Sequence, residues 1–513
     1  MAGVTTGRQN RGHEAEGLKA NAVGFIGALI IGLASTAPAY SLAAVIGLVV
    51  VTVGAQAPAV FLVSFIPMFF IAAAFYYMNR ADQDCGTSFS WVTRAMGPRT
   101  GWMAGWAISV TGILVVGSLS DVAARYTFLL FDLDALAASK MAVTALAVTY
   151  IVIVTAISVI GIEIAARMQE ILIVPEVLSL LLFAVVALVK VYGGDAPAGS
   201  LQPQLSWFSP VGAASVQSLI SGLLIGVFIY WGWESAVNLN EETRNSSTAS
   251  GMAALFSTVI LLVTYLAVTA AVVAFAGLST VKQFADNDAI FSVLAHDVLG
   301  SPWDKLVMFA VLASALASSQ TTILPGSRTA LSMARASAIP AVLSRIHPRF
   351  HTPHVSTIMI GALGVAWYVP VNFISENFLY DTLSALSLMV AFYYSLTGYS
   401  CAIYYRRELL KSAKNFLFIG VAPVLGATLL AYLFFRSLTI LADPGESYTG
   451  ATLFGLGLPL VIGLGFLLLG VVFMILWRFT GDGDFFNRRG FETVEPQVAA
   501  GRIAVTAGAP AAN

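Results

Sequence analysis

The sequence has little charge, little cysteine and little histidine, and each shortage argues against a class of protein. Only 10% of its 513 residues are charged, whereas a soluble domain carries about 25%. The net charge of −1 offers no basic surface for nucleic acid. Two cysteines, Cys85 and Cys401, cannot form the disulfide framework of a small secreted protein, and they lack the spacing of a metal site.

The five histidines argue against an enzyme that works inside the membrane. None of them falls within a long apolar run, and the sequence has no His-Glu-x-x-His pattern of the kind that zinc proteases carry. We therefore expect no enzymatic activity, no cofactor and no bound metal.

Apolar runs long enough to cross a lipid bilayer are abundant. Hydrophobic residues make up 58% of the chain, and many runs exceed the roughly 18 residues that a transmembrane helix needs. We predict an all-α membrane protein with about 12 transmembrane helices. The expected spans are 22–51, 58–78, 102–131, 141–163, 171–192, 212–240, 252–276, 303–330, 355–373, 380–404, 415–435 and 453–477.

The positive charges divide unequally between the two sides of this arrangement. About 20 of the 26 lysines and arginines fall in the connections that share a side with both chain ends. The other side holds Arg125, Lys140, Lys190, Lys282, Lys305 and Arg436. The positive-inside rule then places both termini in the cytoplasm and the protein in the cell (inner or plasma) membrane, with the lipid bilayer as its surroundings.

The polar ends of the chain bound the membrane domain. We expect a cytoplasmic N-terminal tail at 1–20, a transmembrane domain at 21–478, and a cytoplasmic tail at 479–513. The last segment turns polar and then rich in alanine, glycine and proline, a composition that predicts disorder.

The first expected span contains a helix-breaking sequence. Its length of about 30 residues would make a helix of about 45 Å, against about 30 Å of hydrocarbon. Ala34, Ser35, Thr36 and Ala37 precede Pro38, which removes a backbone donor and disfavours helix at the residue before it. The segment is either a proline kink or an unwound stretch whose freed backbone groups bind a ligand.

The sixth expected span carries a second irregular segment, Tyr230, Trp231, Gly232, Trp233 and Glu234. A carboxylate within a span is costly and marks a functional site by default, although a group that fixes the packing of a helix end is the alternative. The three aromatic residues fall within four positions and point around the helix, so at least one faces the interior. There they can attract a cation or form a gate.

The two irregular spans stand five spans apart, so a second unit of five spans would be inverted relative to the first. Paired broken spans in inverted repeats are the sequence sign of a substrate site near the middle of the membrane. We predict repeats at about 21–192 and 212–404, followed by two extra helices at about 415–478.

Several motifs in this order resemble the amino acid–polyamine–organocation (APC) superfamily of permeases. They are Cys-Gly-Thr-Ser-Phe-Ser-Trp-Val at 85–92, Trp-Gly-Trp-Glu-Ser-Ala at 231–236, Asn-Glu-Glu-Thr-Arg-Asn at 240–245 and Ser-Arg-Thr-Ala-Leu-Ser-Met-Ala-Arg at 327–335. The resemblance implies a LeuT-type fold of five plus five inverted spans, with discontinuous helices 1 and 6. It also implies a permease for amino acids or amines.

The first irregular segment departs from the pattern of the superfamily's amino acid permeases, which carry a Gly-Ser-Gly-like run there. The Gly-Leu-Ala start with a proline soon after is nearer to the polyamine importers, so recognition of an α-carboxylate stays open. We expect residues 34–37 to bind polar or anionic ends of a substrate, since Ser35, Thr36 and nearby amides can donate hydrogen bonds. We expect residues 230–234 to bind an ammonium group, with Glu234 as its carboxylate.

Glu176 in the fifth span is the residue we assign to ion coupling. Proton-coupled members of the superfamily often place a lysine seven residues after a Gln or Asn, and counting from Gln169 that position is Glu176. Burial disfavours the charged form of a carboxyl group, so Glu176 can take up and release a proton. The alternatives are a purely structural buried glutamate, or sodium coupling that uses the hydroxyls of Ser314, Ser318 and Ser319.

The sequence thus predicts a secondary active transporter that takes up amino acids or related amines with protons, by alternating access. A polyamine (putrescine) importer and an amino acid exchanger are alternatives of the same class. An ion channel or a transporter-like sensor is the alternative of another class.

Overall fold

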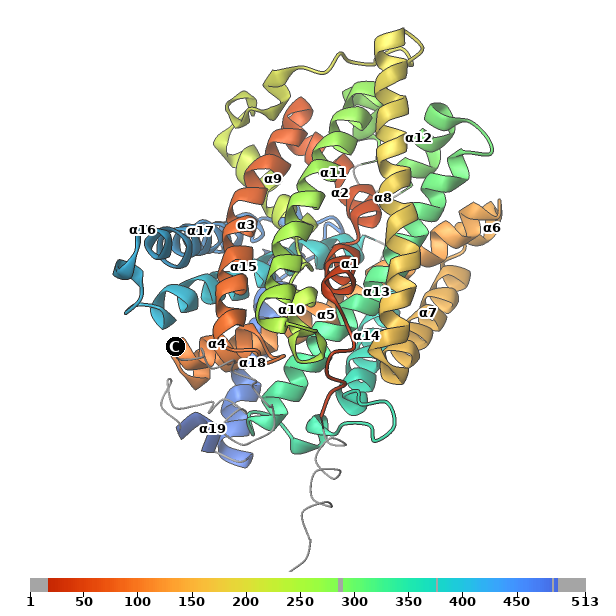
Figure 1. Cartoon of the computed structure of the whole chain (residues 1–513). Coiled ribbons are helices and arrows are strands. Elements are labelled where there is room, and N and C mark those ends of the chain that lie inside the picture. Colours follow the sequence, from red (N-terminus) through yellow and green to blue (C-terminus); the bar gives the residue numbers. More distant parts are fainter. Residues whose placement is uncertain (1–16, 285–288, 375–376, 482–483, 488–513) are drawn as a thin grey trace, which may run out of the picture.

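The computed structural model describes residues 17–284, 289–374, 377–481 and 484–487. Within these residues the fold is a bundle of helices, ten of which are long and apolar enough to cross a membrane. The bundle is built around α1 and α2, which follow each other near its centre, and α8, α11 and α13 contact both of them (Figure 1). The prediction of an all-α membrane protein is confirmed.

The described chain contains nineteen α-helices, four of them only three or four residues long, and one short β-hairpin. The helices are α1 Phe25–Ser35, α2 Pro38–Val53, α3 Ala57–Ala81, α4 Ser88–Met96, α5 Pro98–Leu130, α6 Asp134–Ala137, α7 Lys140–Ile160, α8 Ile162–Gly193, α9 Val216–Ile229, α10 Ser235–Asn238, α11 Ser246–Lys282, α12 Ile290–Leu299, α13 Asp304–Arg335, α14 His354–Ile374, α15 Phe378–Tyr404, α16 Ala413–Asn415, α17 Ala422–Ile440, α18 Leu458–Thr480 and α19 Asp484–Asn487. Strand β1 (Thr452–Leu453) pairs antiparallel with β2 (Leu456–Gly457).

The helices overlap the expected spans, but several boundaries differ. The expected first and second spans lie in one apolar stretch, Phe25–Ala81, and the sixth is divided between the shorter α9 and α10. Helix α8 begins nine residues before the expected position 171 and continues through Pro175. The expected twelfth span begins too early, because residues 452–457 form the β-hairpin before α18. The count of twelve membrane crossings stays a prediction.

Two short helices in the connections were not predicted. Helix α4 follows α3, and nearly all of its residues are buried; α12 lies between α11 and α13. Apolar run length cannot find such helices, because each is far too short to span a bilayer.

The C-terminal tail is partly packed, contrary to the expectation of disorder from residue 479 onward. Helix α18 continues to Thr480, and Phe485 and Phe486 of α19 are buried. Phe485 stacks on Phe89 of α4, with ring centroids 5.7 Å apart. The two phenylalanines supply the apolar surface through which this part of the tail packs. Most of the remaining tail lies outside the described residues, as does most of the expected N-terminal tail at 1–20.

The two ends of the bundle are held together by different contacts. At one end, which we call the basic side, the segment after α3, the segment after α10 and the end of α13 meet through Glu241 and Arg335. At the opposite side, the Lys305 ammonium group at the start of α13 donates to the Leu130 carbonyl at 3.0 Å and to Asp132 at 2.6 Å. The last contacts tie the end of α5 to the start of α13.

Candidate functional site

The first irregular segment is a break between two helices. Helix α1 ends at Ser35 and α2 begins at Pro38, so Thr36 and Ala37 separate them. Ala37 has the left-handed dihedral φ of 48°, which stops the helix, while Pro38 suits the first position of the next one. Ala34 and Ser35 belong to the last turn of α1.

The second irregular segment is also a break, and it covers the predicted residues 230–234. Helix α9 ends at Ile229 and α10 begins at Ser235. Gly232 has a φ of 122°, a conformation that residues with a Cβ atom adopt only under strain. The glycine between the two tryptophans therefore allows the chain to turn here.

The two breaks touch each other. The Ser35 and Ser235 hydroxyl oxygens are 2.6 Å apart and share a hydrogen bond. A Cβ atom on Gly232 would lie 2.4 Å from the Ser35 carbonyl oxygen, so only glycine permits this approach. Helix α1 packs against α10 and α2 against α9, which brings four helix ends together in the buried interior.

Side chains from neighbouring helices bind the backbone that the breaks leave unpaired. The Ser318 hydroxyl of α13 donates to the Ser35 carbonyl at 3.0 Å. The Tyr265 hydroxyl of α11 donates to the carbonyl of Ile229, the last residue of α9, at 2.7 Å. Backbone groups freed inside a membrane need such partners, and here α11 and α13 supply them.

Glu176 is a residue of α8, and its side chain contacts the first residues of α2, just after the first break. Its Oε1 accepts a hydrogen bond from the Ala39 amide at 3.0 Å, and the Tyr40 amide donates to the Ser314 hydroxyl at 3.2 Å. The Glu176 side chain is fully buried, and its Oε2 has no donor in bonding geometry among the described residues. The positive end of the α2 dipole thus faces this carboxyl group.

Glu234 is enclosed by hydrogen-bond donors. Its Oε1 accepts from the Tyr393 hydroxyl at 2.5 Å, and its Oε2 accepts from the Tyr394 hydroxyl and from the Gly232 amide, the latter at 3.1 Å. The indole of Trp231 donates in turn to the Tyr393 hydroxyl at 2.5 Å. These bonds join the second break to α15.

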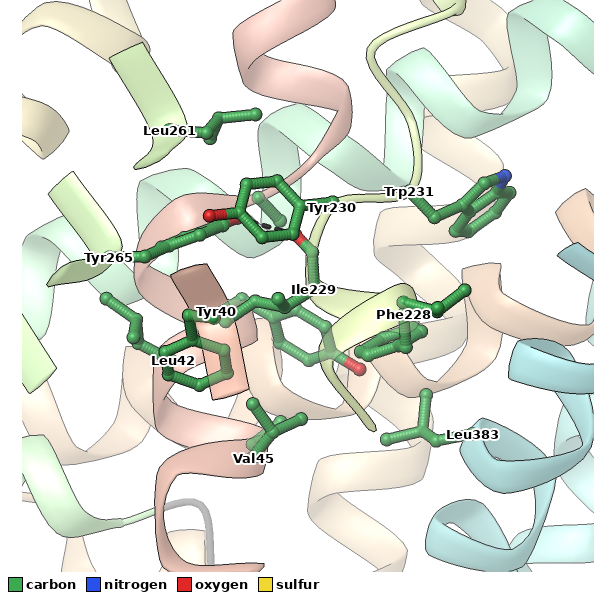
Figure 2. Packing of buried hydrophobic residues seen from close by; sticks show 14 of the residues in the cluster. Tyr40, Leu42, Val45, Phe228, Ile229, Tyr230, Trp231, Leu261, Tyr265 and Leu383 are labelled. Carbon is green, nitrogen blue, oxygen red and sulfur yellow. Dashed lines mark hydrogen bonds between the residues drawn. The ribbon is translucent and has the colours of Figure 1, made fainter. Parts of the chain in front are cut away.

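The aromatic residues of the second break point in different directions. In Figure 2, Tyr230 and Trp231 extend to opposite sides of the chain, and Tyr230 lies beside Tyr265. The rings of Tyr230 and Tyr265 meet edge to face, with centroids 5.2 Å apart. The Tyr230 hydroxyl and the Trp233 indole nitrogen are buried and have no hydrogen-bond partner among the described residues. They are polar groups with unused bonding capacity inside the bundle.

The structure therefore brings the predicted residues 34–37 and 230–234 together, and it places Glu176 beside the first break. The hydroxyls of Ser35 and Thr36, expected to donate to a substrate, already have protein partners, since Thr36 Oγ1 donates to the Leu33 carbonyl. Three tyrosines of this region were not predicted to belong to the site: Tyr265, Tyr393 and Tyr394. The sequence around a tyrosine in an apolar run does not indicate which distant span its side chain contacts.

A charged cluster lies at the basic side and consists of Glu241, Glu242, Arg328 and Arg335. Arg328 and Glu242 form a two-pronged ion pair at 2.7 and 3.0 Å, and only 1% and 0% of their side chains are exposed. Arg335 binds both carboxylate oxygens of Glu241 at 2.9 and 3.0 Å. The motif at 240–245 and the motif at 327–335, which both resemble the superfamily, are thus joined by ion pairs. Arg244 lies apart, where it donates to the Asn21 carbonyl.

Asp84, Cys85 and Glu241 bring three possible metal-ligand atoms within 4.8 Å of one another. Protein donors already bind the two carboxylates: Ser90 and Ser332 donate to Asp84, and Arg335 donates to Glu241. Burial, followed by the neighbouring Glu241 carboxylate, raises the pKa of the Cys85 thiol well above its usual value. This geometry suits a hydrogen-bonded ion-pair network better than a metal centre.

Comparisons with known proteins agree on one family. A family model described as amino acid permease matches residues 21–467. The branched-chain amino acid permease BcaP of Bacillus subtilis is 26% identical over 270 residues, which cover 52% of this chain and 52% of that relative. BcaP of Lactococcus lactis is 23% identical and covers 70% of this chain and 77% of its own length.

A relative of different specificity and a solved structure extend the comparison. The low-affinity putrescine importer PlaP of Escherichia coli is 23% identical over 388 residues, 72% of this chain and 78% of that protein. The crystal structure of MhsT in complex with L-phenylalanine superposes with a TM-score of 0.58 at 14% identity, over 80% of this chain and 98% of that chain. At this identity the likeness concerns the fold alone, which is of the LeuT type.

Proposed function

The chain belongs to the amino acid permease family, and from this premise we propose that it is a secondary active transporter which imports amino acids or related amines by alternating access. The observation that carries the proposal is the contact of two broken spans in the buried interior, through Ser35 and Ser235. The proposal places the transporter in the cell membrane with the basic side and both termini in the cytoplasm.

The second break is the proposed substrate site. The unused Tyr230 hydroxyl and Trp233 indole nitrogen can bind polar groups of a ligand, and Glu234 provides a carboxylate. The relatives named as branched-chain amino acid permeases and as a putrescine importer have substrates that share a primary ammonium group. We propose that this ammonium group binds near Glu234, with the faces of the aromatic rings adding cation–π attraction.

Uptake into proteoliposomes tests the transport proposal directly. Purified full-length protein is reconstituted and supplied with radiolabelled leucine, putrescine or lysine, with and without an imposed pH gradient. Saturable uptake of at least one amino acid or amine is expected. Ion current without saturable amine flux would instead indicate a channel, and ligand binding without any flux would indicate a sensor.

Glu234→Gln is expected to weaken putrescine and leucine alike, because both carry the primary ammonium group that is proposed to bind near Glu234. A hydrogen bond to a charged group contributes about 1.5–3 kcal/mol, so the loss of affinity should be roughly tenfold or more. Competition assays with the two ligands measure the losses. Glu408→Gln, at a partly exposed position, is the control. Unchanged affinity for both ligands would argue against an ammonium site at Glu234.

We further propose that Glu176 couples transport to protons. It is fully buried, it binds the first free amide of α2, and its second oxygen can carry a proton without displacing a donor. Protonation of Glu176 would weaken the hydrogen bond that its carboxyl group accepts from the Ala39 amide. The start of α2 would then be bound less firmly to α8. The hydroxyls that a sodium ion would need, those of Ser314 and Ser318, are engaged with Tyr40 and Ser35, which favours protons.

Glu176→Gln is expected to abolish the stimulation of uptake by external acid while leaving part of the substrate binding intact. The amide keeps the shape of the carboxyl group but cannot take up a proton. The comparison of uptake at several external pH values, alongside an equilibrium binding assay, measures both effects. Glu170→Gln is the control because Glu170 lies on the same helix and is exposed. Unchanged pH dependence in the Glu176 variant would remove this residue from the mechanism.

A further inference from the structure

An apolar groove of about 460 Å³ lies on the surface of the bundle between α7 and α14, which pack side by side at the lower right of Figure 1. Its lining residues fall between Ile151 and Ile160 of α7 and between Ile358 and Val365 of α14. Val152 and Ile358 are 59% and 52% exposed, so the groove opens toward the surroundings of the bundle. Nothing in the proposed transport cycle uses it.

The floor of the groove offers no hydrogen bond to a ligand. A Cβ atom on Gly361 of α14 would lie 2.3 Å from the Thr155 hydroxyl of α7, so the glycine allows the two helices to meet there. The Thr155 hydroxyl donates to the Ile151 carbonyl of its own helix at 2.6 Å. The other lining side chains are aliphatic. A floor of this kind suits a hydrocarbon chain and disfavours a polar solute, which would lose its hydration.

The length and position of the groove match one leaflet of a bilayer. Helix α7 rises about 14 Å from Ile151 to Ile160, which is about half of the roughly 30 Å of hydrocarbon. One end of the groove lies at the basic side, where α7 ends and α14 begins. There the Thr352 hydroxyl donates to the carbonyl of Val159, a lining residue, at 2.6 Å. The groove therefore extends from the basic side to about the middle of the membrane.

Two arginines gather at this end of the groove. Arg345 lies close enough to His354, the first residue of α14, for their charges to interact. The Arg349 guanidinium lies over the Phe350 ring at 5.5 Å, and Phe350 stacks on His347 with ring centroids 4.5 Å apart. His347 in turn meets His354 edge to face at 5.3 Å. These contacts hold both arginines beside the start of α14.

The two arginines are available to a ligand. Arg345 and Arg349 are exposed, and neither forms an ion pair within the described part of the chain. Glu163, three residues beyond the end of α7, is bound to the Lys19 ammonium group at 2.8 Å. Guanidinium groups in this setting bind phosphate oxygens well.

We propose that the groove between α7 and α14 holds an acyl chain of an anionic phospholipid from the basic-side leaflet, whose headgroup phosphate lies beside Arg345 and Arg349. The apolar floor accounts for the chain, and the two cations account for the preference for an anionic headgroup. The depth of the groove sets the leaflet from which the lipid comes.

Lipid titration of the purified full-length protein in detergent tests the proposal. Phosphatidylglycerol, phosphatidylcholine and inorganic phosphate are added separately, and binding is followed by native mass spectrometry and by thermal shift. Phosphatidylglycerol is expected to form a one-to-one adduct, to raise the Tm and to bind more tightly than phosphatidylcholine. Inorganic phosphate is expected to leave the Tm unchanged. An equal shift caused by inorganic phosphate would overturn the proposal, because a free anion does not need the groove.

The headgroup contact is tested by Arg345→Gln combined with Arg349→Gln. This double variant is expected to bind phosphatidylglycerol roughly tenfold more weakly, as the loss of two cations beside an anionic headgroup predicts, and phosphatidylcholine as before. Arg407→Gln combined with Lys414→Gln is the matched control, since it removes two exposed cations from the same side of the bundle, outside the groove. Equal phosphatidylglycerol binding by the two double variants would overturn the proposal.

The chain contact is tested by Ala156→Trp, which fills the groove and removes no charge. Both lipids should bind roughly tenfold more weakly, which is the cost of losing contact with about two methylene groups. Ala145→Trp, at an exposed position of α7 outside the groove, should bind them as the wild type does. A dimer that Ala156→Trp disrupts, without any lipid adduct, would assign the groove to a second copy of the chain and overturn the proposal.

Discussion

Replacing Arg328 by methionine is expected to destabilise the protein by about 3–5 kcal/mol, because the change leaves the Glu242 carboxylate buried without its cation. Both side chains are almost completely inaccessible, and two hydrogen bonds hold them together. A charge in such surroundings cannot recover its lost hydration. The expected signs are a large fall in Tm in detergent and a low yield of folded protein.

Two companion variants separate the cost of the unpaired charge from the loss of packing. Arg328→Met combined with Glu242→Leu should recover much of the stability, because replacing both members of a buried ion pair with apolar residues is often nearly neutral. Lys411→Met, in an exposed pair with Glu408, should cost less than about 1 kcal/mol. A double variant no more stable than Arg328→Met alone would mean that Glu242 does not carry the cost.

Gly232→Ala is expected to abolish transport and to lower stability by about 2–5 kcal/mol. The methyl group would lie 2.4 Å from the Ser35 carbonyl oxygen, and the φ of 122° would add backbone strain. The second break would have to move away from the first, which separates the Ser35 and Ser235 hydroxyls. Substrate uptake in proteoliposomes and Tm in detergent measure the two effects.

Gly199→Ala is the control for the strain alone. Gly199 has a φ of 99°, but a Cβ atom there would meet nothing within 4 Å. This variant should lose about 1–2 kcal/mol of stability and keep its transport activity. If the two alanine variants behaved alike, contact between the breaks would not be what makes Gly232 necessary.

The positions of both breaks could be predicted from the sequence because their causes are local. Pro38 removes a backbone donor whatever surrounds it, and Glu234 is conspicuous in any apolar run. The partners of the breaks could not be predicted in this way. Tyr393 reaches Glu234 from a span that lies 159 positions further along the chain, so their contact depends on how α15 packs against the second break. Packing between distant spans leaves no local pattern.

The ion pairs of the charged cluster also could not be predicted from local sequence. Glu241, Glu242 and Arg244 lie within four positions of one another in the sequence. In the structure, Arg244 binds the Asn21 carbonyl, and the cations that pair with the two glutamates come from α13. Nearness in sequence therefore does not identify the ion-pair partners, because the acidic side chains of the segment after α10 point toward α13.

The hydrogen bond between Ser35 and Ser235 constrains how the protein can move. It fastens the end of α1 to the start of α10, and Ser318 fastens the same residue of α1 to α13. A neutral hydrogen bond contributes only about 0.5–1.5 kcal/mol net, so the fastening is easily reversed. In any conformational change, α1 and α10 must therefore either move together as one rigid unit or separate at the hydrogen bond between Ser35 and Ser235. Parting would expose two hydroxyls that need new partners, which water or a bound molecule can provide.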